Sequence, residues 1–422
     1  MAASAAFPIL APLEPPEAQA ATELPFPVHF RHPAYSTSTP PLLALFATDG
    51  TLDYDLALVC CCILAAVSWD KGYLALRQQG VLEKVQRPSD GLLRGREYLF
   101  CLEDVDISER YPIVHSFHNW RFPHDNLPPQ WAQLDIPDYI PPPLHPGPLA
   151  VPGRDGGCRI SGYIDAVELA HLIPVKEKEW FVSNQMSKYC RFTTSQHRML
   201  SDDQNIILLR SDLHHLFDAR RIALVPKQID IDTSRPPKLL LHVLEPGSSM
   251  QLAPLYHNRC LQQIRGVSKE FLFARFAWSL FTDDRIPFVS WPGALNIFLW
   301  NKTTEQVETR ACTSKDVSSF SQVFDFSTRS QSRSVSPKKR QMVDSLEWGH
   351  CDSASNGDDD DDWFGDSSFE HDESPRGRSS FGMPLGESMS KKRRLNEACS
   401  TPSMSGEMPE ALSQAEMPSQ SL

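Results

Sequence analysis

The stretch that decides the fold reads CRISGYIDAVELAHLIP over residues 158–174 and, after a polar insert, DDQNIILLRSDLHHLFDARRIALVPK over residues 202–227. Two short apolar runs within it, AVELAHLIP (166–174) and IILL (206–209), have the length and composition of strands. A third run, RIALVP (221–226), reads as a return strand. The stretch therefore predicts two strands separated by an insert, and a third strand near its end.

The segment between the second and third runs has the pattern of a short helix. Ser211 or Asp212 can cap its start, and the helix would run to about Asp218. His214 and Asp218 are four residues apart, a spacing that places both side chains on one helix face. A His nitrogen and a carboxylate oxygen on one face can reach a single cation, so this pair is a candidate metal half-site.

Two further residues in the stretch suit phosphodiester hydrolysis. His171 lies near the end of the first apolar run, which Pro174 closes, and a neutral His is a suitable general base near pH 7. Asn205 opens the second run, and its amide can fasten the neighbouring loop so that the His ring points correctly. With a divalent ion to neutralise the developing charge, the residues match the separate needs of the reaction.

The order His171, Asn205, His214 and Asp218 resembles the HNH nuclease family, which is built as a small ββα unit around one metal ion. The resemblance implies that His171 is the general base, Asn205 the loop-positioning residue, and His214 a metal ligand with Asp218 as an additional ligand. It implies one divalent ion, with Mg²⁺, Mn²⁺, Ni²⁺ and Zn²⁺ all open, and DNA as the substrate, with RNA as the second candidate. The phrase NIILLRSDLHHLFD (205–218) is similar to HNH domains of fungal proteins whose role is undefined.

One position departs from the pattern of many HNH enzymes, which carry Asp or His as a metal ligand directly before the first His. Here that residue is Ala170, so a ligand is missing or is supplied by Glu168, Asp212 or another residue. Two functions follow. The first is a metal-dependent endonuclease, and the second is a catalytically inactive binding or regulatory protein that keeps the HNH scaffold.

The remaining composition places this stretch in a larger protein. The formal charge of −12 includes an acidic run at residues 358–362, so it does not argue against nucleic acid elsewhere. The cysteines form no CxxC pair, which fits a reducing intracellular setting. The longest apolar run, residues 56–69, is shorter than the ~20 residues of a membrane span. No basic leader opens the chain, so no secretory signal is expected. No membrane partner is expected, since the apolar run is too short, and no small-molecule cofactor is expected.

We expect an α+β globular region with an embedded ββα-metal unit and disordered termini. A buried helix is predicted at 55–69, a strand at 98–106, and a second buried helix at 269–281 capped by Ser268. Proline excludes regular structure from much of 110–153, with Trp120 and Trp131 as candidate anchors. The predicted divisions, in chain order, are a disordered N-terminal segment (1–40), a helical and irregular region (41–157), the HNH domain (158–227), the rest of the globular region (228–300) and a disordered tail (301–422).

Two basic clusters in the tail, SPKKR (336–340) and KKRR (391–394), are typical of nuclear import signals. They predict a nuclear location.

Overall fold

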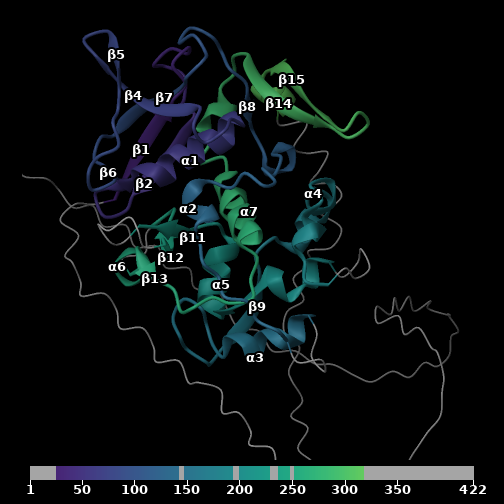
Figure 1. The fold of residues 1–422 in the computed structure, drawn as a ribbon. Coiled ribbons are helices and arrows are strands. Elements are labelled where there is room, and N and C mark those ends of the chain that lie inside the picture. Colours follow the sequence, from purple (N-terminus) through teal and green to yellow (C-terminus); the bar gives the residue numbers. More distant parts are fainter. Residues whose placement is uncertain (1–24, 142–146, 193–198, 229–235, 248–250, 318–422) are drawn as a thin grey trace, which may run out of the picture. The chain divides into compact units, whose positions relative to one another are not determined.

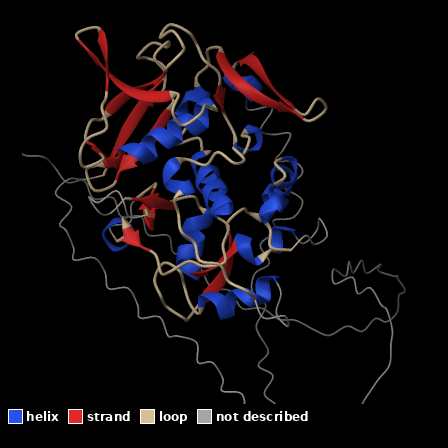
Figure 2. Cartoon of the chain, viewed as in Figure 1, coloured by secondary structure: helices blue, strands red, loops and turns tan. Residues whose placement is uncertain are grey.

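A computed structural model describes five parts of the chain: residues 25–141, 147–192, 199–228, 236–247 and 251–317 (Figure 1). The tail with its two basic clusters and its acidic run lies outside the described residues, as do residues 1–24. Helices and several small sheets are mixed along the described chain, so the α+β class predicted from the sequence is confirmed (Figure 2).

The largest sheet has five strands in the order β2-β1-β7-β4-β5. Its strands are β1 (Phe26–Arg31), β2 (Leu43–Ala47), β4 (Gly72–Gln78), β5 (Val81–Lys84) and β7 (Glu97–Leu102). β1 pairs antiparallel with β2 and parallel with β7, which is the strand predicted at 98–106. The prediction of disorder over 1–40 is therefore wrong for the residues that form β1. The sequence FPVHFR alternates buried and exposed positions, a strand signal that the flanking prolines obscured.

The first predicted helix is α1 (Tyr54–Ala65). Asp53 caps it by accepting a hydrogen bond from the backbone N–H of Leu56 at 2.7 Å. Ten of its residues are buried, including the three consecutive cysteines Cys60 to Cys62, because neighbours cover the helix on several sides. It lies against β4 and β8 (Ile113–Val114), beside the five-stranded sheet (Figure 1).

A second sheet joins two segments that are far apart in the sequence, in the order β15-β14-β8. β14 (Leu295–Asn301) and β15 (Gln306–Cys312) form an antiparallel hairpin, and β14 pairs parallel with β8. Regular structure therefore continues past residue 300, where the sequence predicted the disordered tail to begin. That boundary is wrong because half-exposed strands with polar outer faces carry little hydrophobic signal. A short pair, β3 (Leu52–Asp53) with β6 (Leu92–Leu93), completes this half of the fold.

The stretch over residues 158–227 forms β9 (Val167–His171), β10 (Ile206–Arg210), α5 (Ser211–Asp218) and β11 (Ile222–Lys227). β9 and β10 form a two-stranded antiparallel sheet, and β11 pairs with β12 (Lys238–Val243), which in turn pairs with β13 (Arg259–Cys260). The insert between β9 and β10 contains α4 (Lys178–Ser183), anchored by the buried Trp180 and Phe181.

One apolar helix, α7 (Lys269–Leu280), packs against β11, α1 and α2 (Pro129–Ala132). Ser268 caps it, as predicted. The remaining short helices are α3 (Val151–Asp155) and α6 (Leu252–Tyr256). Trp120 and Trp131 are both buried, so the irregular segment is anchored where the sequence placed its anchors. No helix in the described ranges is long and apolar enough to span a bilayer.

Candidate active site

The strand pair and the helix that follows it bring the predicted site residues to one end of a small unit. In the β9–β10 register His171 lies opposite Ile206, while Val167 and Arg210 pair at the other end. α5 begins directly after Arg210 and packs on both strands. Its eight residues rise about 12 Å at 1.5 Å per residue, so the chain returns toward the end that carries His171. Asp218, the last residue of α5, therefore lies near that end.

His214 faces a carboxylate at each ring nitrogen. Its Nδ1 lies 2.8 Å from Oε2 of Glu168, and its Nε2 lies 3.3 Å from Oδ2 of Asp218. The hydrogen bond with Asp218 raises the pKa of His214, burial opposes this, and the hydrogen bond with Glu168 adds to the rise. Burial alone would raise the pKa of Asp218, but the hydrogen bond from His214 and the charge of Arg275 bring it below its ordinary value. The helical spacing therefore brings the side chains of His214 and Asp218 together, and Glu168 reaches His214 from β9.

His171 has the electrostatic surroundings of a proton acceptor. Burial lowers its pKa, and the nearby positive charges of His214 and Arg275 lower it further, against the opposing charge of Asp218. The ring is therefore neutral at pH 7. No side chain within the described ranges hydrogen-bonds this ring, so a nitrogen is available to a water molecule.

Asn205 holds the chain that follows His171. Its side chain is fully buried, its Oδ1 accepts a hydrogen bond from the N–H of Ile173 at 2.8 Å, and its Nδ2 donates to the carbonyls of Ile173 at 3.1 Å and Leu200 at 2.9 Å. The backbone carbonyl of Asn205 also accepts from the N–H of Leu172 at 2.8 Å. Three of these four hydrogen bonds thus fix Leu172 and Ile173, the residues directly after His171, which limits how the His171 ring can be oriented.

Arg275, on α7, is a site residue that the sequence analysis missed. Its Nη1 donates to the carbonyl of His171 at 3.2 Å, and its Nη2 donates to the carbonyl of Phe217 at 2.6 Å and to Oδ1 of Asp218 at 3.2 Å. Burial lowers its pKa to about 10, so the guanidinium stays charged at neutral pH. The signal was present in KEFLFARFAWSLF: a single Arg on an otherwise apolar helix must be buried with its partners.

The structure distinguishes between the two residues that were candidates to replace the ligand missing at Ala170. Ala170 is fully buried in the core. Glu168 contacts His214 at 2.8 Å, whereas Asp212 forms an ion pair with Arg210 at 2.7 Å. Glu168 is thus the acidic residue that β9 contributes to the site, although it reaches the nitrogen of His214 opposite to the one that faces Asp218.

The His214–Asp218 pair fits a divalent ion as two of its ligands. Nε2 and Oδ2 are 3.3 Å apart, close to the separation of two adjacent ligands that each lie about 2.0–2.3 Å from one ion. Across the described ranges no three His, Cys, Asp or Glu side chains converge as a metal site. Mg²⁺ in phosphate-processing sites typically takes one or two carboxylates and fills its other positions with water and phosphate oxygens. A two-ligand site of this kind is what the residues allow.

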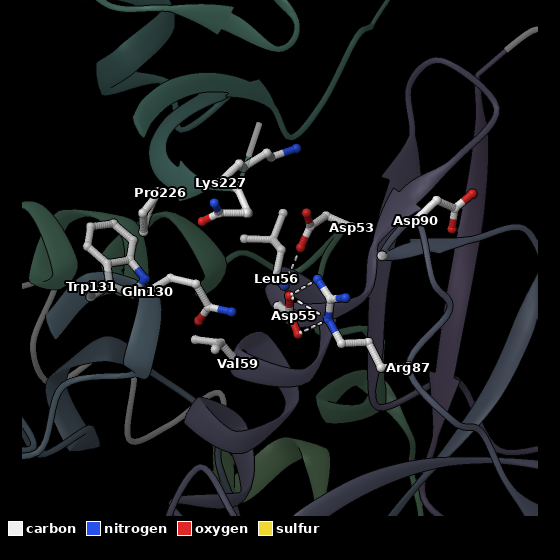
Figure 3. A pocket seen from close by; sticks show the side chains of 12 residues that line it. Asp53, Asp55, Leu56, Val59, Arg87, Asp90, Gln130, Trp131, Pro226 and Lys227 are labelled. Atoms are coloured by element: carbon white, nitrogen blue, oxygen red, sulfur yellow. Dashed lines mark hydrogen bonds and ion pairs between the residues drawn. The ribbon is translucent and has the colours of Figure 1, made fainter. Parts of the chain in front are cut away.

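A second charged cluster lines a small cavity of about 40 Å³ where α1 meets the strand β11 (Figure 3). The charged groups where α1 meets β11 already have partners. Asp55 binds Arg87 through both carboxylate oxygens at 2.9–3.0 Å, and Asp53 caps α1. Lys227 donates to Asn258 at 2.8 Å. We interpret this cluster as a structural junction between the N-terminal half of the fold and the β11–β12 ribbon.

Comparison with known proteins identifies the same stretch that the geometry does. Residues 158–225 match the family described as HNH endonuclease. No curated protein and no solved structure matches the chain. The matched residues contain His171, Asn205, His214, Asp218 and Glu168, whereas Arg275 and the five-stranded sheet lie outside them. The chain thus carries an HNH nuclease domain at residues 158–225, within a larger α+β fold.

Proposed function

We propose that this protein is a metal-dependent endonuclease that hydrolyses phosphodiester bonds in DNA. The observation that carries the proposal is the arrangement around Arg275, whose guanidinium binds the carbonyl of His171 and the carboxylate of Asp218 at 3.2 Å each. The candidate base and the candidate metal ligand thus lie on either side of one buried cation.

In this mechanism His171 acts as the general base. Its ring, neutral because burial lowers its pKa, accepts a proton from the attacking water. Asn205 keeps the ring oriented by fixing Leu172 and Ile173. Arg275 fixes the carbonyl of His171 from the other side. These contacts leave the base with little freedom, which reduces the entropic cost of reaching a reactive geometry.

His214 and Asp218 would hold the divalent ion through Nε2 and Oδ2. When bound, the ion would supply positive charge to offset the charge developing on the phosphate and on the departing 3′ oxygen. Nε2 of His214 must be free of its proton to act as a ligand. Glu168 at Nδ1 then fixes the tautomer, because it accepts the remaining ring proton. Plasmid nicking with Mg²⁺, Mn²⁺, Ni²⁺ and Zn²⁺ in turn identifies the metal that is used.

The test is plasmid nicking with each of these four metals, comparing the wild type with His171→Ala, His214→Ala and His215→Ala. His215 is the matched control, since it is adjacent to His214 and exposed. We expect nicking by the wild type and the control, and a loss of about 10²-fold or more in the other two variants, because each removes the base or a ligand. Undiminished cleavage by both His171→Ala and His214→Ala would exclude this site as the source of activity. An RNA substrate cleaved in place of DNA would correct the substrate class.

The second candidate function is an inactive HNH scaffold that binds nucleic acid. It is favoured by the closed pairing of His214 with Glu168 and Asp218 together with the apolar Ala170. Binding of DNA without nicking in any of the four metals would support this function over the endonuclease.

A further inference from the structure

Three cations meet around one indole ring beside the candidate active site. Measured to the centroid of the Trp278 ring, Cζ of Arg220 lies at 3.8 Å, Cζ of Arg275 at 4.5 Å and Nζ of Lys176 at 5.0 Å. They come from three parts of the chain: Lys176 follows β9, Arg220 follows α5, and Arg275 shares α7 with Trp278. We name Lys176, Arg220 and Trp278 the Trp278 cluster, since Arg275 is already committed to the carbonyls of the active site.

The charges of the Trp278 cluster are incompletely balanced by the protein. Lys176 is exposed and has no hydrogen bond or ion pair with any described residue. Arg220 donates to the carbonyl of Phe281. Of the neighbouring acids, Glu177 accepts from Nε1 of Trp278 at 2.8 Å, and Asp218 binds Arg275 and His214. Asp283 also lies near enough for its charge to act on Arg220, but no acid in the described ranges forms an ion pair with Lys176 or Arg220. An anion that approached from solvent would find two cations able to receive it.

Arg220 adopts a backbone conformation that is more common for glycine. It has a φ of 60°, in the left-handed region, and follows Ala219, the residue after the end of α5, while the N–H of Arg221 closes the helix end on the carbonyl of Leu216 at 3.0 Å. Glycine is the usual residue at this position because other residues pay a steric cost there. An arginine in its place brings a guanidinium onto Trp278 at the edge of the active site.

We propose that Lys176 and Arg220 bind a DNA backbone phosphate next to the scissile one and so set the register of the strand in the active site. The proposal rests on the proposed nuclease function for its substrate. Its chemistry is that of phosphate positioning: Arg offers a planar fork of donors and Lys a point charge, and such contacts orient a duplex without reading its sequence. Lys176 lies near enough to Asp218 for the two charges to interact. Because Asp218 is the proposed metal ligand, the cluster lies next to the position of the scissile phosphate.

The experiment measures DNA binding without cleavage. The parent is the full chain with His171→Ala, in EDTA, and the probe is a fluorescent DNA duplex titrated at several salt concentrations. The variants are Lys176→Gln, Arg220→Gln and the control Lys84→Gln. Lys84 also lies over an aromatic ring, at 4.7 Å from Tyr73, but on the edge of the five-stranded sheet.

Each variant of the cluster should bind several-fold more weakly near physiological salt and should reduce the slope of log K against log salt by about 0.9, the loss of one phosphate contact. Lys84→Gln should leave both unchanged. Lys176 is exposed, so its variant tests the proposal even if Arg220→Gln fails to fold. Slopes equal to the parent in Lys176→Gln, or a parent that does not bind DNA, would overturn the proposal.

The outcome is separable from the endonuclease proposal. If DNA binding depends on Lys176 and Arg220 but the wild type does not nick DNA, the phosphate-site proposal stands and the endonuclease proposal fails. If the wild type nicks DNA but the salt slope does not depend on Lys176, the endonuclease proposal stands and the phosphate-site proposal fails.

Discussion

Asn205 shows how much one side chain decides at the residue scale. It is fully buried, and all three hydrogen bonds of its amide go to backbone groups of Leu200 and Ile173. A buried polar group left without a partner lowers the stability of the fold by more than the net contribution of the hydrogen bond that it loses. An apolar residue of similar size in place of Asn205 would leave these backbone groups without partners.

Replacing Asn205 with Ala should therefore lower the free energy of unfolding by roughly 2–4 kcal/mol and abolish nicking. Urea unfolding followed by tryptophan fluorescence measures the first effect. Asn126→Ala is the control, since Asn126 is exposed and offers only its backbone carbonyl to Trp69. A variant of Asn205 as stable and as active as the control would show that the amide network does not position His171.

At the scale of elements, helix α7 is the one that joins the HNH domain to the rest of the fold. It packs on β11 and on α1, and it carries both Arg275 and Trp278 to the active site. Its N-terminus is fixed by Ser268, whose Oγ accepts from the N–H of Phe271 at 3.4 Å and donates to Glu270 at 2.7 Å. The stability of this helix end and the placement of Arg275 are therefore coupled.

Ser268→Ala should cost about 1 kcal/mol of stability, the usual value of an N-cap. Thermal unfolding measures this loss. Ser290→Ala is the matched control, because Ser290 is exposed and its hydroxyl donates only to the carbonyl of Pro287. A melting temperature for Ser268→Ala equal to that of the control would show that burial of α7 alone fixes its start.

At the scale of the whole molecule, buried histidines connect stability to pH. His32 stacks on Tyr111 at 3.7 Å between ring centroids and contacts Tyr35 and Phe288. Burial lowers its pKa to about 4, with the hydrogen bond to the carbonyl of Tyr111 acting in the opposite direction. His115 is likewise buried, and its pKa is also lowered to about 4 by burial. Both rings are neutral in the folded protein.

The unfolded chain therefore binds more protons than the folded one between these values of about 4 and the ordinary pKa of about 6.5. Stability rises with pH in this window and falls as the pH drops through it, by about 2 kcal/mol for each histidine between pH 7 and pH 5. Urea unfolding at both pH values checks this. His32→Phe should lose less stability on acidification than the wild type, and an equal loss in both would exclude His32 as a source of the acid sensitivity.

The whole fold also depends on pairings between distant segments. β1 pairs parallel with β7, and β8 pairs parallel with β14 across more than 180 residues. Thr48 donates to the carbonyl of Val243 at 3.1 Å, which links the turn after β2 to the ribbon β11–β12. Local sequence carries no record of such pairings, because strand partners are chosen by the collective burial of the faces they cover.

The sequence by itself determined the local elements that place the site. The apolar runs ending at His171 and beginning at Ile206, and the four-residue spacing of His214 and Asp218, are properties of contiguous chain, and strand and helix periodicities expose them directly. The roles assigned to these residues remain predictions that the nicking assay tests. Only the tertiary structure decided that Glu168, rather than Asp212, reaches His214, because both acids are adjacent to the site in sequence and packing alone separates them.

The tertiary structure likewise decided that Arg275 binds Asp218 and that Lys176 and Arg220 meet on Trp278. These residues are as many as 102 positions apart, and they come together because α7 must bury its apolar faces against the HNH domain. That burial is a collective effect of the whole core and has no local periodicity, so no reading of neighbouring residues could have shown it.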